Sequence, residues 1–385
     1  MTKSARRQIL FPLLFACFTI GFTFCASTIA NYFGEEFKLD NFQLNVLPLA
    51  MFIWYLFIGI PISKFARVHS NKKVILIGLS LMTAGIIALI LSQNFWQAIL
   101  TFVLLGLGNV MLQVIYNPLL TFIAPKNEGA SFMILRQITE AITGIVLPLL
   151  LIWSNRYLGN WRTIIWASVI LAIIAIIWLS KTKIPQQAEE GKITSQVINK
   201  ILHTPGIVIL LLGIVTIGGF NNSLMTIVPR LLVERTGIAF SLANLSNTVF
   251  FALRLIGEII GAFLLLRVKP WKFFNFMSLI GVLAMAVLLF IKSSWLIFAV
   301  IGITGFVYSS LTSLIFAQVL KRVPQHQDAA SGLVITSWSG ASFFSLITGI
   351  VTKITNTQTS GVVFFLLCSL FVLYLGRKYT QLKIS

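Results

Sequence analysis

Long apolar runs are the feature that most constrains what this chain can become. A helix needs about 20 apolar residues to cross a hydrocarbon core of roughly 30 Å. Soluble domains carry about 25% charged residues, whereas this chain carries 10% and is 57% hydrophobic. The sequence therefore predicts an all-α polytopic membrane protein with two six-helix bundles. The twelve predicted spans are 9–32, 43–65, 74–91, 96–123, 130–153, 163–179, 207–231, 242–266, 273–290, 295–320, 332–352 and 362–375.

The net charge of +19 does not by itself indicate a disordered or a nucleic-acid-binding protein. Disorder requires low hydrophobicity, and nucleic-acid binders carry their basic residues as patches on a polar surface. Here the lysines and arginines lie between apolar runs, so we expect no nucleic-acid partner. No phosphate-binding loop, metal-ligand spacing or catalytic constellation is present, and the three cysteines lie inside apolar runs. We therefore expect no enzymatic activity, cofactor or metal site.

The distribution of basic residues predicts the orientation of the chain. With the N-terminus inside, 20 of the 29 lysines and arginines fall in inner segments and 7 in outer ones. The positive-inside rule then places both termini in the cytoplasm. We expect a multi-pass protein of the cell membrane, surrounded by the lipid bilayer and monomeric. The first span is too long for a cleavable signal peptide and lacks a small-residue cleavage site.

The chain divides into two halves with matching patterns. A polar linker at 181–205 separates an N-terminal bundle at 1–180 from a C-terminal bundle at 206–385. Gly106 precedes Pro125 by the same 19 residues that separate Gly305 from Pro324. Parallel repeats of this kind place a central site at the repeat interface. We expect that site between the halves, lined by the first, fourth, seventh and tenth spans with help from the fifth and eleventh.

Ionisable residues inside spans are costly and mark functional sites by default. The fifth span contains Arg136 and Glu140, and the eighth contains Arg254 and Glu258, each pair four residues apart. One interpretation is a gate or proton relay, and the other is an ion pair that only locks helices together. The depths of the residues predict pairing of Arg136 with Glu258 and of Glu140 with Arg254. Pairing along each helix is the alternative.

Uncharged polar residues inside the spans form a second candidate set. Amides both donate and accept hydrogen bonds, and aromatic rings pack against C–H faces, so the set suits a polyhydroxylated ligand. The alternative for any one member is a hydrogen bond between helices, worth under about 1 kcal/mol. The predicted solute-binding residues are Gln113, Asn117, Gln137, Asn221, Asn222, Tyr308, Ser309 and Trp338, with Ser310 beside them.

Four stretches resemble the major facilitator superfamily, and within it the fucose–galactose–glucose:proton symporter group of sugar permeases. The group's second-span start resembles residues 37–43 leading to Pro61, and its fourth-span signature resembles 106–118 with Gln113. Its Leu-x-Gln motif is similar to 135–137, and 229–235 resembles the end of the seventh span in related hexose carriers. The resemblance implies a carrier of a small polar solute.

This sequence departs from the group at the residues that take the coupling proton. The group has an aspartate in the first span, whereas residues 21–27 here contain no carboxylate. Gln113 stands where the group can carry a glutamate, and the basic loop motif after the second span is degraded. Proton or sodium coupling therefore depends on other residues, and Glu140 and Glu258 are the acidic residues deep in the spans.

The leading hypothesis is a secondary transporter that moves a monosaccharide or similar hydrophilic solute by alternating access. Carriers of amino acids, vitamins or peptide-like nutrients form a second class, together with exporters of amphipathic drugs. A drug exporter should have a larger, more aromatic and less amide-rich cavity. A non-transporting receptor or assembly factor on a carrier fold is the third, and we expect it to need a soluble domain that the short loops do not supply.

Overall fold

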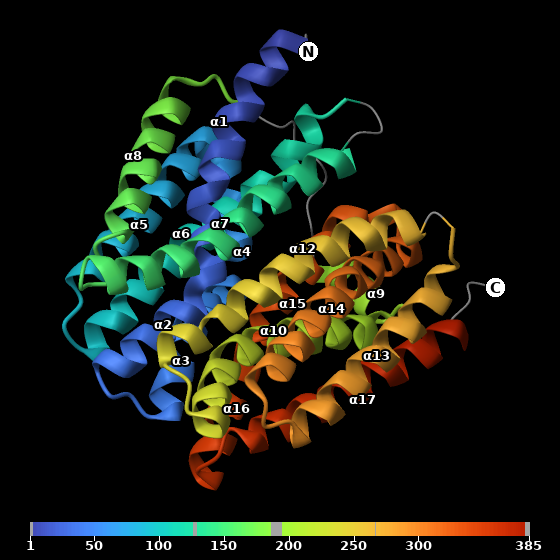
Figure 1. Ribbon diagram of the computed structural model, residues 1–385. Coiled ribbons are helices and arrows are strands. Elements are labelled where there is room, and N and C mark those ends of the chain that lie inside the picture. Colours follow the sequence, from blue (N-terminus) through green and yellow to red (C-terminus); the bar gives the residue numbers. More distant parts are fainter. Residues whose placement is uncertain (1–2, 126–128, 186–194, 266, 382–385) are drawn as a thin grey trace. The chain divides into compact units, whose positions relative to one another are not determined.

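The computed structural model describes residues 3–125, 129–185, 195–265 and 267–381. Every regular element in these ranges is a helix (Figure 1). Among the described residues, eleven helices are long and apolar enough to cross a membrane, and the 17-residue α8 is a shorter apolar helix at the predicted sixth span. The predicted class, an all-helical polytopic membrane protein, is confirmed. Residues 186–194 of the predicted linker lie outside the described ranges.

The first six predicted spans correspond to nine elements. These are α1 (Lys3–Gly21), η1 (Phe22–Cys25) and α2 (Ala26–Glu36), then α3 (Asn41–Phe52), α4 (Trp54–His69), α5 (Asn71–Leu91), α6 (Phe95–Ile123), α7 (Gly129–Tyr157) and α8 (Ile165–Lys181). The short α9 (Ser195–Leu202) follows. The later spans are α10 (Ile207–Thr236), α11 (Phe240–Ala243) with α12 (Leu245–Leu265), α13 (Pro270–Phe290), α14 (Ser294–Arg322), η2 (Pro324–His326) with α15 (Gln327–Gly340) and α16 (Ser342–Thr355), and α17 (Thr359–Gln381).

The first span changes its winding in the middle. The 3-10 turn η1 separates α1 from α2 immediately after Gly21. The hydroxyl of Thr23 donates to the carbonyl of Ile20 at 2.8 Å, a back-bond that competes with regular helix geometry. A 3-10 stretch inside a long helix is typical of a hinge or a strained site. The second span is likewise divided at Ile53 and the eleventh at Ala341.

The chain forms two compact units. One contains residues 1–39 and 46–190, and the other contains 40–45 and 191–385. The segment Asp40–Asn45 belongs to the second unit, where Lys353 donates to Asp40 at 2.8 Å and Gln358 donates to Asn41 at 3.2 Å. Partial burial raises the pKa of Asp40, but hydrogen bonds from Lys353 and the Gln43 backbone outweigh it and hold that pKa below its usual value.

Equivalent helices of the two units have matching lengths and contacts. Helices α5 and α13 each have 21 residues, and α6 and α14 each have 29. A side chain at Gly106 of α6 would collide with the backbone carbonyl of Met51. A side chain at Gly305 of α14 would collide with the backbone carbonyl of Phe250 in the same way. Small residues allow helix backbones to approach closely in membranes, which explains both glycines.

Apolar side chains fill each unit and also cover its outside. In the first unit Phe102 and Tyr116 of α6 are fully buried against neighbouring helices. Phe290 and Trp295, by contrast, are 83% exposed at the junction of α13 and α14. A water-soluble protein seldom exposes apolar surface on this scale, whereas a lipid-facing surface requires it. The distribution of apolar residues thus fits the bilayer on the outside and close packing within each unit.

Candidate functional site

A buried polar cluster joins α6 and α7 inside the first unit. Arg136 of α7 donates through Nη1 to Oε1 of Gln113 of α6 at 2.7 Å. The same nitrogen lies 3.4 Å from Oε1 of Glu140, one turn further along α7. Residues four apart share a face of a helix, which is why Arg136 and Glu140 meet. Three of the sequence-predicted site residues are therefore in contact.

Close packing of the first span positions this cluster. A side chain at Gly21 would lie 2.6 Å from the backbone carbonyl of Glu140, so only glycine allows α1 to approach α7 here. The hydroxyl of Thr143 donates to the carbonyl of Phe18 at 3.1 Å, and the thiol of Cys25 reaches the carbonyl of Thr143 at 3.7 Å. The 3-10 turn η1 thus lies against α7 at the level of Glu140.

The charged side chains of this cluster are more deeply buried than those of the second charged pair. The side chains of Arg136 and Glu140 are 8% and 2% exposed, whereas those of Arg254 and Glu258 are each 24% exposed. Within the described part of the chain, Nε of Arg136 has no hydrogen-bond partner. A buried donor without a partner costs about 1–3 kcal/mol, so a ligand atom that filled this position would bind with that advantage. The cluster can therefore offer a ligand a donor, an amide and a titratable carboxylate.

The other predicted residues of the first unit lie on the same two helices. Gln137 is half-buried and follows Arg136 on α7. Asn117 lies one turn after Gln113 on α6, and its side chain is outside the described residues. Their roles in binding a solute stay predictions.

Two predicted asparagines lie in the middle of α10 in the second unit. Asn221 is 7% exposed, and within the described ranges its Oδ1 atom has no hydrogen-bond partner. Asn222 is half-buried. Trp338 of α15 packs against α10, because a side chain at Gly218 would lie 3.3 Å from its ring. Trp338 thus packs against the stretch of α10 that immediately precedes the two asparagines.

The predicted residues of α14 pack inside the second unit. The ring of Tyr308 lies 4.8 Å from that of Phe220 and is 1% exposed. The hydroxyl of Ser309 donates to the carbonyl of Phe306 in its own helix, and that of Ser310 donates to the carbonyl of Gly257 in α12 at 3.1 Å. The contacts of Tyr308 and Ser310 are the inter-helix packing that the sequence offers as an alternative to solute binding, whereas the bond of Ser309 stays within α14.

Each charged pair is formed along its own helix. Arg254 donates through Nε to Oε1 of Glu258 at 3.2 Å, and Arg136 contacts Glu140 as described above. The two pairs belong to different units, so the pairing of Arg136 with Glu258 and of Glu140 with Arg254 stays a prediction.

Several polar neighbours of the cluster were not predicted from the sequence. Asn109 of α6 donates to the hydroxyl of Tyr55 of α4 at 2.9 Å. The charges of Arg136 and Glu140 also act on Tyr55, Cys17 and Tyr116. One signal could have found Asn109, since it precedes Gln113 by one turn on the same face of α6. Tyr55 and Cys17 come from other helices, so only the fold brings them close.

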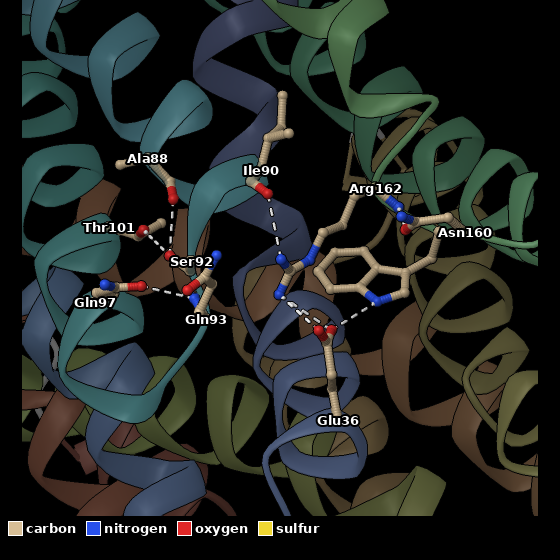
Figure 2. Close-up of polar contacts among 10 residues, drawn as sticks. Glu36, Ala88, Ile90, Ser92, Gln93, Gln97, Thr101, Asn160 and Arg162 are labelled. Carbon is tan, nitrogen blue, oxygen red and sulfur yellow. Dashed lines mark hydrogen bonds and ion pairs between the residues drawn. The ribbon is translucent and has the colours of Figure 1, made fainter.

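A second polar cluster lies at the opposite end of the first unit from the N-terminus. Figure 2 shows Arg162 donating to the carbonyl of Ile90 at 3.2 Å and to Oε2 of Glu36 at 3.1 Å. The indole of Trp161 donates to Glu36 at 3.1 Å, and the ring of Phe33 lies 5.4 Å below the Arg162 guanidinium. Partial burial lowers the pKa of Arg162, and Glu36 opposes that shift. This cluster fastens the end of α2 to the α5 and α8 regions.

Comparisons with known proteins identify the family. The sequence model of the Major Facilitator Superfamily matches residues 12–346, and the chain belongs to this family. It is thus a polytopic membrane transporter. A probable sugar efflux transporter of Helicobacter pylori is 24% identical over 331 residues, covering 82% of this chain and 81% of the relative.

Solved structures have the same fold. The E. coli fucose:proton symporter matches with a TM-score of 0.69 at 18% identity, covering 96% of this chain and 98% of the symporter chain. A bacterial homologue of the human lysosomal transporter Spinster matches with a TM-score of 0.78 at 16% identity, and each chain is covered completely. At these identities the likeness shows the fold alone. The predicted resemblance to major facilitators, with a fucose:proton symporter among the structural neighbours, is confirmed.

Proposed function

We propose that this chain is a secondary transporter that moves a monosaccharide, or a similar small hydrophilic solute, across the cell membrane by alternating access. The observation that carries the proposal is the partly buried hydrogen bond between Arg136 and Gln113 beside the carboxylate of Glu140. The sugar efflux transporter of Helicobacter pylori supports a sugar as solute, because the match extends over most of both chains.

The chemistry of the cluster suits hydroxyl groups. A sugar hydroxyl both donates and accepts, and so can accept from a guanidinium N–H while it donates to an amide oxygen. Arg136 has a buried Nε without a partner in the described part of the chain, and half-buried Gln113 supplies the amide. Asn221 of the second unit offers a buried amide oxygen in the same state. A solute bound by such groups would satisfy donors and acceptors that the protein alone leaves unmatched.

Glu140 supplies a means of coupling transport to a proton. When it is ionised, its negative charge neutralises Arg136. Protonation removes that charge and leaves Arg136 to be neutralised or hydrogen-bonded by other groups, including a solute hydroxyl. Proton and solute binding would then favour each other. Glu258 is the alternative proton carrier, but its greater exposure weakens the electrostatic link to Arg254. Sodium coupling and uniport remain the competing modes.

The basic residues support an orientation with both termini in the cytoplasm, as the positive-inside rule requires. The proposal places the protein in the cell membrane as a monomer. No nucleic acid, metal or organic cofactor takes part in the mechanism.

Counterflow in proteoliposomes tests the solute class. Vesicles loaded with unlabelled D-glucose, D-galactose, L-fucose, an amino acid or a nucleoside are diluted into a trace of the same radiolabelled compound. We expect label to accumulate for at least one monosaccharide and for neither of the other classes.

Two glutamines of α6 provide a matched pair of variants. Gln113→Ala removes the acceptor of Arg136 and should lower counterflow at least tenfold. Gln97→Ala changes the same residue type at the exposed start of the helix, where the side chain accepts from the Gln93 backbone, and should stay within twofold of wild type. Accumulation of the amino acid or nucleoside alone would refute the proposed solute class. Equal activity of the two variants would refute the role of Gln113.

A further inference from the structure

An open cleft lies at the N-terminal end of the first unit, outside the buried cluster. It has a volume of about 910 Å³ and lies between the start of α1 and the end of α8. These two segments lie at the same end of the unit (Figure 1). Clefts of about 300–1,000 Å³ are the usual size for small-molecule sites. Its lining residues are Arg7, Gln8, Ile9, Phe11, Pro12, Trp178, Lys181, Thr182 and Lys183.

The lining combines positive charge with apolar surface. Arg7, Lys181 and Lys183 contribute three cations, and none of the described residues that line the cleft is acidic. Phe11 is 56% exposed and Trp178 is 43% exposed. Both belong to membrane-spanning helices close to the helix ends, where tryptophan favours the level of the lipid headgroups. A ligand here would meet cations at one side and hydrocarbon-facing rings at the other.

Both walls of the cleft are fastened to the rest of the unit. On one side, Nε of Arg6 donates to the carbonyl of Ile123 at 2.9 Å and ties the start of α1 to the end of α6. On the other side, Nζ of Lys72 donates to the carbonyl of Ser180 at 2.6 Å and holds the end of α8. These contacts preorganise the cleft, which lowers the ordering cost of binding.

We propose that this cleft binds an anionic glycerophospholipid, with the phosphoryl group among Arg7, Lys181 and Lys183 and the acyl chains along Phe11 and Trp178. Charge complementarity selects the anionic headgroup, since basic pockets between membrane helices hold such headgroups. The apolar rim selects a lipid over a free phosphate ion, because an inorganic anion makes no use of the two exposed rings. The site is independent of the proposed solute and lies at the bilayer interface.

Fluorescence quenching provides a site-specific test. Purified protein in detergent is titrated with brominated phosphatidylglycerol and, separately, with brominated phosphatidylcholine of the same acyl chains. The signal of Trp178 is the difference between wild type and Trp178→Phe. We expect saturable quenching of that signal by phosphatidylglycerol, at an apparent affinity at least fivefold higher than for phosphatidylcholine. Inorganic phosphate at millimolar concentration should not displace the lipid.

The chain offers a control of identical composition. The triple variant Arg7→Gln, Lys181→Gln and Lys183→Gln should weaken phosphatidylglycerol binding at least fivefold. The triple variant Arg267→Gln, Lys269→Gln and Lys272→Gln removes one arginine and two lysines from exposed positions before and at the start of α13, and should change binding less than twofold. If the cleft triple fails to fold, each of its single variants should still weaken binding about twofold.

Three results would overturn the lipid site. Equal losses in the two triples would mean that only overall charge matters, and equal quenching by the two lipids would mean that the headgroup is not recognised. Displacement of the lipid by inorganic phosphate would identify the cleft as a free-anion site.

Discussion

Glu36 and Glu234 occupy equivalent positions in the two units, and each carboxylate binds the connection between the last two spans of its own unit. Glu36 lies 15 residues after Gly21 and Glu234 lies 15 residues after Gly219, and each of these glycines precedes a phenylalanine. Glu36 accepts from Trp161 and Arg162, which lie between α7 and α8. Glu234 accepts from the hydroxyl of Thr357 at 2.5 Å and the backbone N–H of Gln358 at 2.8 Å, between α16 and α17.

This relationship predicts that the C-terminal end of each first span is held by its carboxylate. Glu36→Gln should lower the stability of the detergent-solubilised protein by about 1 kcal/mol, because a partly exposed ion pair is worth about that much. The adjacent Glu35 is exposed, so Glu35→Gln provides the control and should leave the melting temperature unchanged. Equal melting temperatures for the two variants would contradict the structural role of Glu36.

A second equivalence concerns two arginines. Arg162 donates to the carbonyl of Ile90 near the end of α5, and Arg235 donates to the carbonyls of Leu288 at 2.6 Å and Ile291 at 2.8 Å at the end of α13. Cations favour helix C-termini, where backbone carbonyls lack partners. The two arginines come from different parts of their repeats but stabilise equivalent helix ends.

Arg235→Lys should therefore destabilise the protein although it keeps the charge. A lysine cannot reproduce the fork through which Nη1 and Nη2 reach several acceptors, including the hydroxyl of Thr359 at 3.0 Å. We expect a loss of about 1–3 kcal/mol, measured as a fall in melting temperature. Arg156→Lys, at an exposed position, should have no measurable effect. A melting temperature of Arg235→Lys equal to that of the wild type would contradict this expectation.

The close approach at two glycines gives a third prediction. Gly106→Ala and Gly305→Ala should each cost about 1–3 kcal/mol by overpacking against the carbonyls of Met51 and Phe250. Gly59→Ala in α4 has open space around the added methyl group and should be neutral or stabilising, since alanine favours a helix over glycine by about 1 kcal/mol. Folded yield after size-exclusion chromatography distinguishes the outcomes. Normal yield from both overpacked variants would contradict the predicted collision.

The long spans were predictable because the bilayer imposes length and hydrophobicity on each of them. The interruptions of the spans were not predictable, since η1 coincides with the close approach of Gly21 to the carbonyl of Glu140, which only the fold brings about. From the sequence we expect Arg235 to be an ordinary residue of an outer loop, and only the fold brings it to the end of α13. Glu36 and Glu234 were not predicted as a pair, although each lies 15 residues after the glycine of a Gly-Phe pair in the sequence.

In the candidate site, too, some contacts could be predicted from the sequence and others depend on the fold. Spacing along α7 gave the contact of Arg136 with Glu140 as the alternative to pairing across the units, because residues four apart share a helix face. Selection of Gln113 as a site residue came from its polarity, but its bond to Arg136 depends on the packing of α6 against α7. The depth argument for pairing across the units concerns helices of separate units and needs its own experiment.

Charge reversal tests that cross-unit pairing. Glu140→Arg alone and Arg254→Glu alone should each abolish transport, because each leaves like charges close together in a low dielectric. If Glu140 pairs with Arg254 during the transport cycle, the double variant should regain at least a tenth of wild-type counterflow. A double variant no better than the worse single variant would leave only the pairs along each helix.

Sugar-driven proton movement is the most direct test of the proposed mechanism. Proteoliposomes containing a pH-sensitive dye receive the monosaccharide identified by counterflow, with no imposed ion gradient, and the internal pH is followed. The account predicts a sugar-dependent pH change that Glu140→Gln abolishes while sugar counterflow continues, and that Glu258→Gln leaves intact. A pH change that survives Glu140→Gln, or sugar transport by the wild type without proton movement, would contradict the coupling role of Glu140.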